Sequence, residues 1–159
     1  MIRLSHVLAT VGAGSLLTAI LYPVFQPASA CGYRPTCLSN VKQAALGLIQ
    51  YAADSDDRFA PGGAWMTLSY PYVKNWDVYR CPSLPKGVWG YAYDRALSGE
   101  QVPEPPSELP MVYDSDRRSK NAADLVSSLP RAGRHLSRDR KAIQNSIAYA
   151  DGHAKGATP

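Results

Sequence analysis

The sequence contains none of the short motifs that mark the common classes of enzyme. Gly-x-Ser-x-Gly, the phosphate-binding loop, the dinucleotide fingerprint and His-Glu-x-x-His are all absent. Cys81 and His135 have the residue types of a nucleophile and its base, but a cysteine held in a disulfide cannot act as a nucleophile. We therefore expect no enzymatic activity, no small-molecule substrate and no cofactor.

Charged residues are missing from a long stretch near the N-terminus. Residues 7–33 contain no Lys, Arg, Asp, Glu or His. Within them, the nineteen residues 7–25 are nearly all apolar, and as a helix they approach the thickness of a bilayer core. With Arg3 before it and the small residues 28–30 after it, the stretch also fits a secretory signal. Residues 1–26 are therefore predicted to be a membrane anchor or signal segment, with the following domain outside the cytoplasm.

Cysteine is scarce, and the count is odd. With Cys31, Cys37 and Cys81 alone, at least one thiol stays outside any disulfide within the chain. Ala28-Ser29-Ala30-Cys31 resembles a bacterial lipobox, which makes Cys31 a candidate for lipidation. Lipidation would leave Cys37 and Cys81 as the disulfide pair, whereas parity alone also allows Cys31 as the partner of Cys81. A disulfide fits an oxidising compartment.

Net charge is small, at +4 over 159 residues. Five of the eleven residues in 131–141 are Lys or Arg. Such a run can contact phosphates of nucleic acid or lipid, but Asp139 interrupts it and a solvated loop is the more usual outcome. We therefore expect no nucleic-acid partner.

The rest of the pattern predicts one α+β domain. Residues 27–36 hold two prolines and a glycine and are predicted to be a linker that breaks the helix. Apolar residues in 38–53 recur at helical spacing. A helical turn at 64–70, ended by Pro71, comes next. Four short extended segments are predicted after it, at 78–81, 88–93, 111–114 and 147–150. The expected fold is an N-terminal apolar helix and then a head, 37–159, in which the amphipathic helix packs on a small antiparallel sheet of three to four strands.

An acidic run follows the predicted amphipathic helix. Asp54, Asp56 and Asp57 could supply alternating oxygen ligands to calcium. The run lacks the glycine and the distal glutamate of an EF-hand loop, so we weigh calcium as a weak candidate beside simply solvated acids.

Near the C-terminus, Asp151-Gly152 predicts a tight hairpin turn, because glycine takes the positive φ that such turns need. His135, Asp151 and His153 have side chains that could bind one metal ion such as zinc. No further ligand has a recognisable spacing. We therefore prefer the structural interpretation, in which Asp151 and Gly152 make the turn and each histidine satisfies a local hydrogen bond.

Seven stretches of the sequence together carry a family resemblance: Ile20–Phe25 (ILYPVF), Cys37–Gln43 (CLSNVKQ), Tyr51–Phe59 (YAADSDDRF), Tyr70–Asn75 (YPYVKN), Tyr79–Ser83 (YRCPS), Arg134-His135 and Tyr149–His153 (YADGH). The chain resembles the prepilin-type, H-x-DG family of pseudopilin-like proteins. The resemblance implies an apolar helix anchored in the inner membrane, a small α+β head facing outward, and no enzymatic activity. It also implies that His135, Asp151 and Gly152 form the family motif. In the fold expected here, a Cys37–Cys81 disulfide would link the amphipathic helix to the sheet.

Two features depart from the family pattern. When Ile20–Phe25 is aligned without gaps, Met1 falls on the glycine of the leader motif and His6 falls on its glutamate. Histidine cannot supply the carboxylate that pilins are thought to pair with a neighbouring subunit. The family also has nine residues between His and Asp-Gly, whereas fifteen separate His135 from Asp151 here.

The sequence thus predicts a membrane-anchored, non-catalytic envelope protein that acts by assembly or binding in a secretion or pilus-like system. Its partners would be a membrane, through residues 7–25, and other pilin-like subunits or a secretion machine. The alternative is a secreted module, or one lipid-anchored at Cys31, that no longer assembles. The third interpretation is a metal-dependent enzyme, which would require a bound metal ion.

Overall fold

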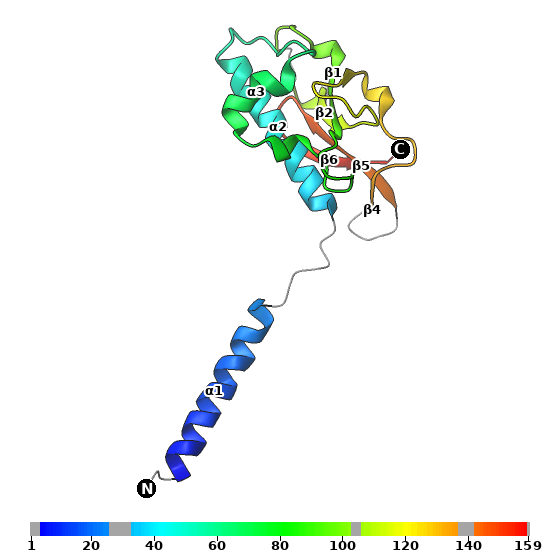
Figure 1. Ribbon diagram of the computed structural model, residues 1–159. Coiled ribbons are helices and arrows are strands. Elements are labelled where there is room, and N and C mark those ends of the chain that lie inside the picture. Colours follow the sequence, from blue (N-terminus) through cyan, green and yellow to red (C-terminus); the bar gives the residue numbers. More distant parts are fainter. Residues whose placement is uncertain (1–3, 26–32, 103–105, 137–141, 159) are drawn as a thin grey trace. The chain divides into compact units, whose positions relative to one another are not determined.

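The computed structural model describes residues 4–25, 33–102, 106–136 and 142–158 and divides the chain into two compact units, Met1–Cys31 and Gly32–Pro159. Helix α1, Leu4–Phe25, makes up the first unit (Figure 1). Its large apolar side chains from Val11 to Tyr22 are exposed. Within the described residues, no helix meets both the length and the apolarity that crossing a membrane requires. The predicted cleavage pattern at 28–30 and Cys31 lie outside the described residues.

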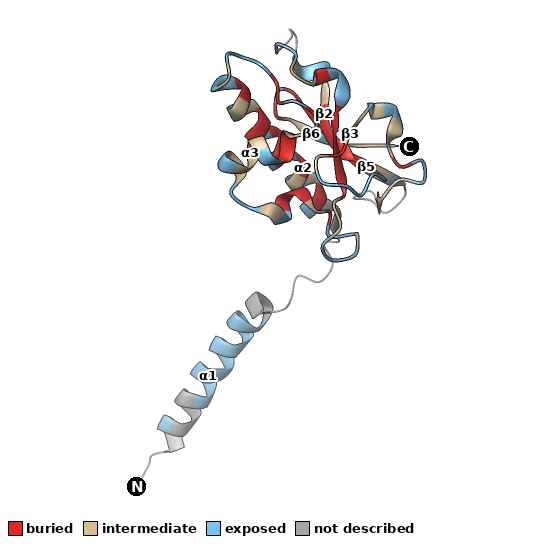
Figure 2. Cartoon of the chain, turned by 45° about the horizontal axis from the view of Figure 1, so that its top comes forward, coloured by how far each residue is buried: buried red, intermediate tan, exposed pale blue. Residues whose placement is uncertain are grey.

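Helix α2, Tyr33–Ala53, is the central helix of the second unit. It starts earlier than the predicted boundary at residue 38, and Pro35 does not break it. Pro35 lies in the first turn, where a backbone N–H has no partner within the helix and its loss costs nothing. One stripe of the helix is buried: Cys37, Val41, Ala44, Ala45, Leu48 and Ala52. Figure 2 shows this buried face in red beside the buried strands.

The segment after α2 differs from its prediction in two places. Helix α3, Trp65–Val73, runs through Pro71 and ends at Lys74, whose left-handed backbone lets its N–H close on the Tyr70 carbonyl at 2.7 Å. The predicted extended piece at 78–81 is instead a 3₁₀ turn, η1, Trp76–Tyr79, since the Asn75 side chain caps it by accepting from the Asp77 N–H.

Within the described residues, the sheet has six strands: β1 Tyr91–Asp94, β2 Pro110–Asp114, β3 Ala123–Asp124, β4 His135–Leu136, β5 Ile143–Tyr149 and β6 Ala154–Ala157. Their order is β3-β1-β2-β5-β4, and β6 also pairs with β5. All pairs are antiparallel except β1 with β3. The α+β class is therefore confirmed, but the predicted sheet of three to four antiparallel strands is wrong. Two-residue strands such as β3 and β4 are too short to show an alternating pattern in the sequence.

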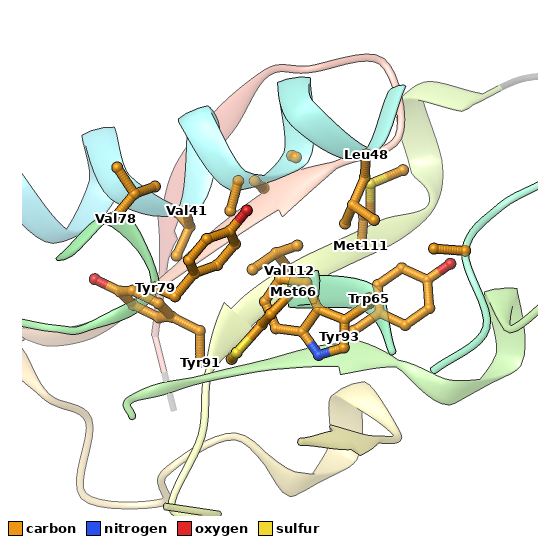
Figure 3. Close-up of a cluster of buried hydrophobic side chains, with 14 of the residues drawn as sticks. Val41, Leu48, Trp65, Met66, Val78, Tyr79, Tyr91, Tyr93, Met111 and Val112 are labelled. Carbon is orange, nitrogen blue, oxygen red and sulfur yellow. The ribbon is translucent and has the colours of Figure 1, made fainter. Parts of the chain in front are cut away.

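Both faces of the sheet are buried. On one face, Tyr91, Tyr93 and Val112 pack with α2 and with Trp65 of α3. Figure 3 shows the side chains of this cluster between α2 and the strands. On the other face, a smaller group packs under the segment 122–129: Ala92, Tyr113, Ala122, Ile147 and Tyr149, with Val126 and Leu129. Because two-sided burial removes the polar-out alternation, strands β1 and β2 are buried at nearly every position.

Candidate functional site

The most closely connected polar groups of the second unit surround a disulfide. Cys37 of α2 and Cys81, just after η1, are bonded, with their Cα atoms 5.4 Å apart and a separation of 44 positions in sequence. This disulfide was among the predictions and is confirmed. Both cysteines are buried. The bond joins the central helix to the loop that leads into β1, so it constrains a long segment of the unfolded chain.

His135 of β4 lies directly beside this disulfide. Its Nε2 is 3.8 Å from Cys81 Sγ and 2.9 Å from Asp114 Oδ2. Its Nδ1 is 3.2 Å from Ser83 Oγ. Because a carboxylate only accepts hydrogen bonds, His135 Nε2 carries the ring proton and donates to Asp114. Nδ1 is then unprotonated and accepts from the Ser83 hydroxyl. The histidine side chain is 1% exposed, so this ring is fixed by the fold.

Asp114, at the end of β2, is the centre of the network. Its Oδ2 accepts from the Ser146 backbone N–H at 2.6 Å and from His135, and its Oδ1 accepts from Arg134 Nη1 at 2.9 Å. Its side chain is fully buried. Three donors and one full positive charge compensate for the carboxylate's lost hydration, which makes burial tolerable.

Arg134 corrects the prediction of a solvated basic loop at 131–141. Its side chain is only 6% exposed. Besides Asp114, the guanidinium donates to the carbonyls of Gly90 at 2.6 Å and Ser115 at 2.7 Å. It reaches Asp116 at 3.4 Å as well. A planar group with several fixed donors suits this site better than a lysine would. Residues 137–141 of the run lie outside the described residues.

A hairpin turn forms at Asp151-Gly152 as predicted, but Gly152 alone of the two residues has the positive φ that a primed turn requires. Strands β5 and β6 pair on either side of it, Gly152 has a φ of +86°, and the Tyr149 N–H donates to the His153 carbonyl at 2.9 Å. Asp151 Oδ1 accepts from the His153 backbone N–H at 3.0 Å and lies 2.6 Å from its Nδ1. The first of these contacts is the main reason why the pKa of Asp151 is lowered. The side chain of His153 is 43% exposed and that of Asp151 is 31% exposed.

The structure separates the three residues that were weighed as one metal site. His135 pairs with Gln144 near the start of β5, whereas Asp151 follows the other end of that strand. At about 3.3 Å per residue, the extended segment from Gln144 to the end of β5 at Tyr149 alone spans roughly 17 Å. Over the described ranges, the group of three metal-ligating side chains that does come together is Cys37, Cys81 and His135.

The acidic run after α2 forms a turn on the surface. Asp56 and Asp57 both have positive φ, near 52° and 53°, and all three aspartates are exposed. Asp54 accepts from the Tyr72 hydroxyl at 2.8 Å. Across the part of the chain that is described, these aspartates do not form a metal-ligating group.

Chemically, the cluster combines residue types that can do several things. Ser83, His135 and Asp114 are linked as in a hydrolase triad, but the serine meets Nδ1 and the carboxylate meets Nε2, the reverse of the serine-protease arrangement. The hydrogen bonds of Ser83 and Asp114 also fix the orientation of the His135 ring, which is the role of a group that stabilises the fold. Sequence reasoning did not single out Asp114 or Ser83, and it assigned Arg134 to solvent. The one available signal was an acid at the end of a buried strand.

Comparison of the chain with protein-family models, with curated proteins and with solved structures gives no match. The resemblance to pseudopilin-like proteins therefore stays a prediction from the sequence stretches quoted above.

Proposed function

We propose that this protein is a pseudopilin-like component of the cell envelope that acts by assembly or binding and not by catalysis. Its head lies outside the cytoplasm, and its N-terminal helix attaches it to apolar surroundings. The observation that carries the proposal is the buried Cys37–Cys81 disulfide, which ties α2 to the start of the sheet. Such a bond persists in an oxidising compartment.

The exposed apolar surface of α1 supports the proposed attachment of the N-terminal helix to apolar surroundings. Val11, Leu16, Leu17 and Ile20 are each more than three-fifths exposed. An uncovered apolar surface of this kind marks contact with a membrane or another protein. In this proposal the occupants are the inner membrane and the corresponding helices of other pilin-like subunits, as in a type II secretion or type IV pilus-like system.

The experiment is a mass analysis of the protein purified from the membrane fraction, with and without reductant. A chain that retains residues 2–25 and gains the mass of two hydrogens on reduction supports the proposal. Photo-crosslinking from Leu16, with Leu125 of the head as a matched exposed position, then identifies what covers α1. Crosslinks to lipid or to pilin-like chains from Leu16 alone are expected. A chain found reduced, or equal crosslinking from both positions, would contradict the proposal.

A second candidate function has its own support. His6 stands where the family has a glutamate, and Ala28-Ser29-Ala30-Cys31 resembles a lipobox. Both favour a lipid-anchored or secreted binding module that does not assemble. In the same mass analysis, this protein would begin at a diacylated Cys31. The variant His6→Glu separates the two functions as well, because only an assembling protein should copurify with more pilin-like subunits once that carboxylate is restored.

A further inference from the structure

Three soft metal ligands meet in the interior of the head. The sulfurs of Cys37 and Cys81 and a ring nitrogen of His135 all lie within 4.8 Å of one another, and all three residues are buried. Cys81 Sγ and His135 Nε2 are 3.8 Å apart. With zinc–sulfur bonds near 2.3 Å and zinc–nitrogen bonds near 2.0 Å, tetrahedral ligands lie roughly 3.3–3.8 Å from each other. Cys81 Sγ and His135 Nε2 already lie at that separation. The two bonded sulfurs would reach it by moving apart once the disulfide is reduced.

We propose that the dithiol form of the head binds one Zn²⁺ through Cys37 Sγ, Cys81 Sγ and His135 Nε2. Asp114 Oδ2, which now accepts a hydrogen bond from that nitrogen, would move onto the metal as the fourth ligand. The disulfide form does not bind it, since its sulfurs carry no negative charge and are bonded to each other. Zinc and the disulfide are thus alternative ways of closing the same junction between α2 and the sheet.

Asp114 is suited to the fourth position by its place and its charge. Its Oδ2 lies 2.9 Å from the same nitrogen that would ligate the metal. Arg134 and the Ser146 N–H hold the carboxylate in place. Two thiolates balance the charge of the zinc ion and Arg134 balances Asp114, so the occupied centre is neutral as a whole. Buried charge without such compensation would be strongly unfavourable.

Ser83 supplies the outer contact that a zinc-bound histidine usually makes. When Nε2 ligates the metal, the ring proton resides on Nδ1, which lies 3.2 Å from Ser83 Oγ. The serine oxygen accepts that hydrogen bond and fixes the orientation of the ring. Outer contacts of this type typically change metal affinity by about 10-fold to 100-fold.

The two states interconvert by ordinary thiol chemistry. A newly made chain carries both cysteines as thiols, and Zn²⁺ displaces one proton from each while the ring proton moves from Nε2 to Nδ1. Oxidation by a disulfide-bonded donor then forms the Cys37–Cys81 bond. The two electrons pass to the donor, which leaves as two thiols after taking up two protons, and the zinc ion is released.

The test uses the full chain in detergent micelles, with Cys31→Ser to remove the third thiol. A phosphine reduces the disulfide, gaining an oxygen atom from water while the two sulfurs take up two hydrogens, and is then removed. Titration with Zn²⁺ alone should show one ion and two released protons per reduced chain, and none for the oxidised chain. Co²⁺ in place of zinc should give thiolate-to-metal charge-transfer absorption. A reduced chain that binds no zinc would overturn the proposal.

Variants locate the site. His135→Asn should lower zinc affinity by about 100-fold or more, and Ser83→Ala by about 10-fold. His153→Asn, which changes the exposed histidine of the turn, is the matched control and should bind zinc like the parent chain. If His135→Asn does not fold, the zinc affinity of Ser83→Ala and the comparison of the oxidised and reduced chains still test whether zinc binds at this site. Binding that survives Cys37→Ser with Cys81→Ser, or that is equal in Ser83→Ala and the control, would overturn the assignment.

Discussion

The described part of the head contains two histidine–aspartate pairs with similar contacts and opposite surroundings. His135 and Asp114 are 2.9 Å apart and almost fully buried, whereas His153 and Asp151 are 2.6 Å apart and about one-third to two-fifths exposed. The buried pair is joined to Arg134, Ser83 and the disulfide. The exposed pair lies at a turn, where the His153 ring stacks on Tyr149. The distance between the histidine and the aspartate therefore does not by itself show how much a pair stabilises the head. Burial and the number of further partners decide what each pair contributes to stability.

The largest expected effect comes from removing the buried cation. Arg134→Met leaves Asp114 buried without its ionic partner and frees two backbone carbonyls, so the free energy of unfolding should fall by about 3–5 kcal/mol. Arg131→Met, an exposed position in the same basic segment, is the control and should change stability little. Urea unfolding of the oxidised full chain measures both variants. An equal loss of unfolding free energy in both variants would contradict a specific role for the buried Arg134–Asp114 pair.

Loss of the disulfide should have a slightly smaller effect. Replacing both Cys37 and Cys81 by serine removes a cross-link between residues that are 44 apart in sequence, and the expected loss is about 3–4 kcal/mol. Cys31→Ser retains the disulfide and should unfold like the parent chain. A loss of similar size in Cys31→Ser would mean that a different pairing stabilises the protein in solution.

Within the exposed pair, glycine should matter more than charge. Gly152→Ala imposes a left-handed backbone on alanine, and its Cβ would lie 2.9 Å from Leu46 Cδ2. We expect a loss of about 1–3 kcal/mol. Gly99→Ala is matched, because Gly99 also has positive φ but an added Cβ there meets no atom within 4 Å. The difference between the two variants isolates the contact with α2. No difference would mean that backbone conformation alone decides.

The smallest effect concerns Asp94, which is buried and has a raised pKa because desolvation outweighs its hydrogen bonds. A raised pKa means that folding favours the neutral acid. The stability from this preference is present below the ordinary pKa of aspartate and is lost as pH rises through the folded value. Asp94→Asn keeps an acceptor for the Ala96 N–H and should raise stability at neutral pH by less than about 1 kcal/mol. The gain should vanish near pH 3, as thermal unfolding at both pH values would show. A gain that did not change with pH would contradict this origin.

The same contrast explains what the sequence could reveal. The turn is local, since Asp151, Gly152 and the flanking strands are adjacent in the chain, and it was predicted. Helix α2 shows its apolar spacing in one stretch and was also predicted, apart from its first turn. The buried cluster joins residues from α2, the loop after η1, β2 and β4. No spacing pattern connects Cys37, Asp114 and Arg134, because only the folded sheet order brings them together.

The most direct test of this account compares Asp114→Asn with Asp151→Asn in the oxidised full chain. Each replaces a carboxylate beside a histidine by a neutral group of the same shape. Equilibrium unfolding in urea, followed by tryptophan fluorescence, should show a loss of about 3–5 kcal/mol for Asp114→Asn and almost no change for Asp151→Asn. Equal losses, or a larger loss at Asp151, would contradict the claim that the buried cluster beside the disulfide holds the head together.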